Sequence, residues 1–148
     1  MDQITTPEYS LASCGAVAIV CWRRVTVESV RTMHERVLQI AARAPRAQVG
    51  LLAVIDKECG LPSADARAEL NHGPKRIGHV LAGAAIVYTG EGIRAAAVRG
   101  MLLTLGALVR NKVPQKVFAT GKEAAQWVTS LVGGEVEAVE RAAQSCTS

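Results

Sequence analysis

An apolar, strand-like run lies in the second half of the chain, GAAIVYT at residues 83–89, and a helical pattern follows it from about residue 93 to residue 110. A second short strand is expected at residues 115–119, QKVFA, and it leads into another helix that begins at residues 120–123, TGKE. Strand, helix, strand and helix at this spacing indicate parallel pairing between the strands. The stretch therefore predicts an α/β fold.

The first half of the chain can be read in the same way. Strands at residues 8–13 and 16–22 are close enough for a β-hairpin, and a helix capped by Thr26 follows them. The run VGLLAVI at residues 49–55 is almost continuously apolar, which is typical of a central strand covered on both faces. Ser63 can cap a further short helix, which the pair Gly73-Pro74 should break.

Together these elements predict an α/β domain built on a single mixed sheet of about five strands, with helices mainly on one face. A chain of 148 residues, 49% of them hydrophobic, is most simply one domain with a continuous aliphatic core. We expect an N-terminal tail at residues 1–7, the α/β domain at residues 8–132, and a C-terminal helical extension or tail at residues 133–148.

Composition argues against several classes of function. The net charge of +4 is spread over scattered arginines, and the few aromatic residues fall at expected core or edge positions, so nucleic-acid binding is not expected. No apolar run is long enough to cross a membrane. The four cysteines have neither Cys-x-x-Cys spacing nor a histidine at metal spacing: Cys14, Cys21, Cys59 and Cys146. We therefore expect a cytoplasmic protein with free thiols and without a metal or other cofactor.

Residues 117–128 read VFATGKEAAQWV: a Val-Phe strand end, a Thr-x-x-Glu helix cap and an Ala-x-x-Trp helix. With the order of the elements, this ending resembles STAS domains, and most closely the SpoIIAA-like branch related to anti-sigma-factor antagonists. The resemblance covers roughly residues 8–132 and implies a regulatory domain that binds a kinase or another signalling partner. Some STAS domains also bind nucleotides or other small ligands.

In the anti-sigma-factor antagonists a phosphorylated serine follows an aspartate where the central strand meets the next helix. Here Asp56 stands at the matching strand end, Lys57 occupies the place of that serine, and Ser63 is the nearest hydroxyl. The resemblance thus implies the position of the functional surface. For Ser63 two interpretations remain open, a helix cap alone or a phosphorylation site that Lys57 could pair with.

Functional groups of open α/β sheets gather at the carboxyl ends of the strands, where helix N-termini and backbone amides converge. That rule selects a loop after the central strand and a segment after the strand at residues 83–89. The candidate partner- or ligand-binding residues are Asp56, Lys57, Glu58, Cys59, Ser63, Thr89, Gly90, Glu91 and Arg94.

The function expected is that of a non-enzymatic regulatory or interaction domain, binding a protein partner through these loops, with a phosphate or another anion as a potential gate. A rival interpretation is a ligand carrier or small enzyme on the same face, with Cys59 or His72 in its chemistry beside Asp56. The sequence GEGIRA at residues 90–95 also matches G-x-G-x-x-A, but it lacks the acidic residue that a dinucleotide site needs. A third interpretation is a structural subunit that forms a homodimer through a sheet edge or a bare helix.

Overall fold

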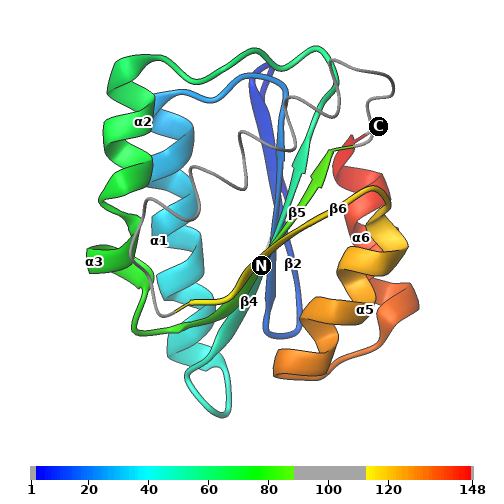
Figure 1. Ribbon diagram of the computed structural model, residues 1–148. Coiled ribbons are helices and arrows are strands. Elements are labelled where there is room, and N and C mark those ends of the chain that lie inside the picture. The colour runs from blue at the N-terminus through cyan, green and yellow to red at the C-terminus, as the bar shows by residue number, and fades with distance from the viewer. Residues whose placement is uncertain (1–2, 89–112, 148) are drawn as a thin grey trace.

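The computed structural model describes residues 3–88 and 113–147 (Figure 1). Its centre is a six-stranded sheet with the strands in sequence order. The strands are β1 (Ile4–Thr5), β2 (Tyr9–Cys14), β3 (Val17–Trp22), β4 (Val49–Ile55), β5 (Leu81–Tyr88) and β6 (Gln115–Phe118). The described helices are α1 (Val27–Arg43), α2 (Ala64–Asn71), α3 (Gly73–Ile77), α5 (Gly121–Val132) and α6 (Val136–Thr147).

The sheet is mixed, as predicted. β1, β2 and β3 pair in antiparallel fashion, and β3, β4, β5 and β6 pair in parallel. Each parallel step needs a crossover, and α1 supplies one between β3 and β4, while α2 and α3 supply the next. The predicted α/β class is therefore confirmed.

The N-terminal segment adds a strand that the sequence did not suggest. Ile4 and Thr5 lie inside the expected tail, but they pair with Leu11 and Ser10 of β2. β1 is thus the strand beside β2, and β2 is an inner strand rather than the edge strand expected at residues 8–13.

Helices cover both faces of the sheet, whereas the sequence favoured mainly one. Figure 1 shows α1, α2 and α3 on one side of the strands and α5 and α6 on the other. One core cluster joins Val20 and Leu51 to Val30 and Val37 of α1. The opposite cluster joins alternate strand residues, such as Ile19, to α5 and α6. β3 is buried along its whole length because both of its faces pack against helices.

Side-chain caps at Thr26, Ser63 and Thr120 set the beginnings of α1, α2 and α5. Thr26 accepts a hydrogen bond from the Ser29 amide at 3.0 Å, and the Ser29 hydroxyl returns one by accepting from the Thr26 amide at 2.9 Å. Thr120 accepts from the Glu123 amide at 3.2 Å, as the Thr-x-x-Glu pattern predicts. The Glu123 carboxylate, however, accepts from the Thr120 hydroxyl and not from the Thr120 amide. Each cap satisfies helix amides that otherwise lack a partner.

Glycines end α5 and separate it from α6. Gly133 and Gly134 have φ values of 84° and 108°, which residues with a Cβ rarely adopt. The break turns the chain so that α6 packs on β2 and β3. The expected C-terminal extension is thus a helix whose apolar side, with Val139, Ala143 and Cys146, belongs to the core.

Two further predictions concern residues at or beyond the limits of the described chain. The helix expected at residues 93–110 lies outside the described residues, as do the candidate residues Thr89, Gly90, Glu91 and Arg94.

Among the described helices, none combines the length and the apolarity needed to cross a membrane.

Candidate functional site

The loop between β4 and α2, residues 56–63, is the candidate site that the structure describes in full, and we call it the β4–α2 loop. It begins where the parallel ladder ends: the Asp56 amide donates to the carbonyl of Trp22 at 2.9 Å. The Asp56 carboxylate then accepts from the Glu58 amide at 2.8 Å, and the Cys59 amide donates to the Asp56 carbonyl at 2.8 Å. These bonds form a turn of the kind that aspartate favours.

The far end of the loop is held by the start of α2. The Ser63 hydroxyl accepts from the Ala66 amide at 3.2 Å, and the Arg67 amide donates to the Ser63 carbonyl at 2.9 Å. Ser63 is therefore an N-cap, as predicted, and its side chain is also exposed. A loop fixed at both ends by backbone hydrogen bonds presents its side chains in a defined arrangement.

The exposed side chains of the loop are charged at its beginning and apolar at its tip. Asp56, Lys57 and Glu58 are exposed, and Leu61 is 65% exposed. Leu61 is the more exposed of the two large hydrophobic residues found at the surface of the described chain, the other being Leu38 at 40%. The sequence analysis did not single out Leu61. The signal was a leucine between Gly60 and Pro62 in an otherwise polar loop.

Cys59 points inward, unlike its neighbours. Its side chain belongs to the core cluster that lies under α1, and its thiol is 3.5 Å from the carbonyl of Gly60. Burial raises the pKa of the Cys59 thiol, and the nearby Asp56 carboxylate raises it further, against a hydrogen bond with the Val25 backbone that lowers it. A thiol held in the neutral form is a poor nucleophile. Cys59 thus anchors the loop to the core.

His72 does not join Cys59 in a catalytic arrangement. Ser63 and His72 flank the eight residues of α2, a length of about 12 Å along the helix axis. The His72 side chain is exposed at the junction of α2 and α3. Among the described residues, no hydrogen bond or ion pair joins His72 to Cys59 or Asp56, so no contact supports the combination considered from the sequence.

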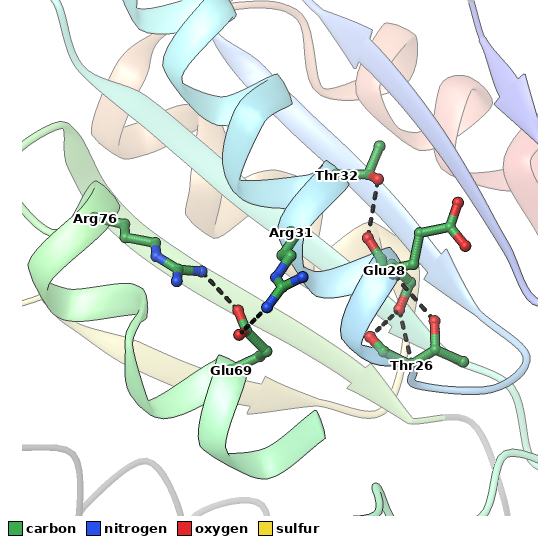
Figure 2. A network of polar contacts seen from close by, with 7 residues as sticks. Thr26, Glu28, Arg31, Thr32, Glu69 and Arg76 are labelled. Atoms are coloured by element: carbon green, nitrogen blue, oxygen red, sulfur yellow. Dashed lines mark hydrogen bonds and ion pairs between the residues drawn. The ribbon is translucent and has the colours of Figure 1, made fainter. Parts of the chain in front are cut away.

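A second polar cluster holds α2 and α3 against α1 (Figure 2). The carboxylate of Glu69 binds Arg31 of α1 at 3.1 Å and Arg76 of α3 at 2.6 Å. Hydrogen bonds from Arg76 and Arg31 lower the pKa of Glu69 to about 2. This bridge joins three helices and so fixes the end of α2 that lies away from the β4–α2 loop. Sequence reasoning missed it, because the three residues lie on separate helices.

His34 lies beside this cluster in the interface between α1 and the start of α3. It is 4% exposed, and its Nδ1 atom has no hydrogen-bond partner among the described residues. Gly73 makes room for the imidazole, since a Cβ at that position would lie 3.3 Å from His34 Nε2. Burial, helped by the nearby Arg76 charge, lowers the pKa of His34 from 6.5 to about 4.

Residues 3–88 and 113–147 contain no group of three or more histidine, cysteine, aspartate or glutamate side chains that could hold a metal ion. Comparison with protein-family models gives no match for the chain, and neither does comparison with curated proteins or with solved structures. The site must therefore be interpreted from its own geometry.

Proposed function

We propose that this chain is a non-enzymatic regulatory or interaction domain that binds a protein partner through the β4–α2 loop. The observation that carries the proposal is Leu61, an aliphatic side chain 65% exposed at the tip of a loop fixed at both ends. When a partner removes an exposed apolar side chain from water, the free energy of binding gains about 25 cal/mol for each Å² of apolar surface buried.

The charges around Leu61 favour a protein over other partners. Asp56 and Glu58 carry negative charge and Lys57 carries positive charge, so the surface is mixed rather than of one sign. A nucleic-acid surface would need concentrated positive charge. An apolar contact surrounded by charged residues is the usual composition of a protein interface.

The resemblance to STAS domains supports the same interpretation and adds a regulatory, cytoplasmic role. It also suggests a gate at Ser63. A phosphate on this exposed hydroxyl would lie at the N-terminus of α2, where the helix dipole favours negative charge, with Lys57 in the same loop. Phosphorylation would alter the charge of the surface close to Leu61.

The test compares two matched substitutions in the full chain, Leu61→Asp in the loop and Leu38→Asp on α1. Purified wild-type and variant proteins are used to capture partners from native extract, and captured proteins are quantified by mass spectrometry and re-measured by calorimetry in purified form. We expect Leu61→Asp to lower the affinity for the partner by at least about tenfold, as for a contact at the centre of an interface. Leu38→Asp should bind as the wild type does.

Equal binding by both variants would contradict the proposal. A small molecule that co-purifies with the chain in native mass spectrometry, in the absence of any partner that depends on Leu61, would favour the ligand-binding alternative. The same preparations report the gate: mass mapping shows whether Ser63 carries a phosphate, and the effect of that phosphate on partner affinity decides its role.

A further inference from the structure

Two cysteines that are 125 positions apart in the sequence meet in the core between β3 and α6. Cys21 is 3% exposed and Cys146 is fully buried, and both belong to the cluster on the α5 and α6 face of the sheet. Their side chains are joined by a hydrogen bond, and the Cys21 thiol also lies 3.8 Å from the carbonyl of Ala143, one turn before Cys146 in α6. We propose that Cys21 and Cys146 form a reversible disulfide when the protein meets a peroxide, and that this bond fastens α6 to the sheet.

The position of Cys146 favours it as the attacking sulfur, because Cys146 lies in the last turn of α6, whereas Cys21 lies in the inner strand β3. The hydrogen bond between the two thiols lowers the pKa of Cys146, and the positive charge of Arg23 lowers it further, while burial opposes both. The same hydrogen bond raises the pKa of Cys21. Cys146 thus loses its proton more readily than Cys21, and the Cys21 thiol stabilises the resulting Cys146 thiolate.

Arg23 is held in place to act on this pair. Its guanidinium donates to the Ser10 hydroxyl at 2.8 Å and to the Thr6 carbonyl at 2.6 Å. Ser10 of β2 lies directly opposite Cys21 of β3 in the antiparallel ladder. The hydrogen bond to Ser10 of the neighbouring strand β2 therefore holds the Arg23 cation near the thiols.

The reaction balances with hydrogen peroxide as the oxidant. The Cys146 thiolate attacks one peroxide oxygen, an S–O bond forms, the O–O bond breaks, and the leaving hydroxide takes a proton to become water. Cys21 then attacks the sulfur of the sulfenic acid, an S–S bond forms, the S–O bond breaks, and the second hydroxide leaves with the Cys21 proton as water. Two thiols lose two electrons in all, and peroxide gains them.

Peroxide reaches the pair through the last turn of α6. Helix ends open more readily than helix centres, and the neighbours of Cys146 in this turn, Ser145 and Thr147, are exposed. Since Cys21 and Cys146 are already in contact, the disulfide can form as soon as this turn opens and recloses.

The test treats the full wild-type chain with hydrogen peroxide and then maps the peptides without reduction. We expect a peptide pair linked through Cys21 and Cys146, a loss of two hydrogens from the intact monomer, and full reversal by dithiothreitol. Cys14 and Cys59 should still react with a maleimide after the chain is denatured. A linkage that involves Cys14 or Cys59, a disulfide between two copies, or no linkage at all overturns the proposal.

Variants assign the roles of the two sulfurs. Cys146→Ser should prevent the linkage, and Cys21→Ser should leave a sulfenic acid on Cys146 that dimedone traps. Cys59→Ser, at the other buried cysteine, is the matched control and should form the linkage at the wild-type rate. Dimedone labelling of Cys59 in place of Cys146 contradicts the proposed order. If either serine variant fails to fold, the peptide map of the wild type still decides the outcome.

Discussion

Lowering the pH should destabilise the protein through His34, and the structure sets both the direction and the size of the effect. The imidazole is packed against Gly73, is 4% exposed, and has no partner for Nδ1 among the described residues. The charged groups that face it are Arg76 and His72, which oppose its protonation, and Glu69, which favours it. Burial is the largest influence, and the pKa falls from 6.5 to about 4.

The sign follows from proton binding. Between a pH of about 4 and 6.5 the unfolded chain protonates His34 and the folded chain does not, so acid favours unfolding. The contribution of His34 to stability is complete above 6.5, declines as the pH falls, and levels off below about 4. Since a tenfold change in a protonation equilibrium is worth about 1.4 kcal/mol, the loss is at most about 3 kcal/mol. That is a large share of the roughly 5–15 kcal/mol that stabilises a typical domain.

Urea denaturation of three proteins, measured above pH 6.5 and near pH 4, provides the assay. Wild type and the control His79→Leu, which changes an exposed histidine, should both lose stability over this range. His34→Leu should lose up to about 3 kcal/mol less, whatever its stability at neutral pH. If His34→Leu shows the same pH dependence as the wild type, the argument from the buried imidazole is refuted. Glu69 loses part of its stabilisation over the same range, because its contribution falls as the pH drops from 4.5 towards about 2, but all three proteins keep Glu69 and the comparison between them is unaffected.

Three further predictions concern stability and can be checked by chemical denaturation. Trp127→Ala should cost about 2 kcal/mol, less than the roughly 3–5 kcal/mol of a fully buried aromatic, because Trp127 is only half-buried beside Phe118; an unchanged midpoint would contradict this. Gly50→Ala should cost about 1–3 kcal/mol, because its Cβ would collide with Val128 of α5, whereas Gly60→Ala meets nothing within 4 Å and should be close to neutral. Ser63→Ala should cost about 1 kcal/mol through loss of the α2 cap, and a cost near zero would show that the hydroxyl does not cap the helix in solution.

Strand positions and helix caps could be predicted because they depend on neighbours in the sequence. The apolar run at residues 49–55 became β4, with the same limits. Thr26, Ser63 and Thr120 became N-caps, because each is followed by amides that its side chain can reach. The position of the β4–α2 loop after a central strand followed in turn.

The covering of both sheet faces was partly available from the sequence. A strand that is apolar at nearly every position needs cover on each side, and the run at residues 49–55 already showed this. What the pattern could not assign was the face that each helix takes. The helix after β6 is not a crossover between parallel strands, so chain connectivity leaves its face open. In the structure α5 packs on the face opposite to α1, with Val128 close to Gly50 of β4.

The sequence by itself determined the α/β class, the approximate positions of most strands, the helix caps and the loop where a site is expected. Only the tertiary structure decided which distant side chains meet. Cys21 reaches Cys146 because α6 packs back on β3, and Glu69 reaches Arg31 because α2 lies against α1. The physical reason is range. Periodicity and capping act over a few residues, whereas the exposure of Leu61 and the burial of His34 result from how whole helices pack on the sheet.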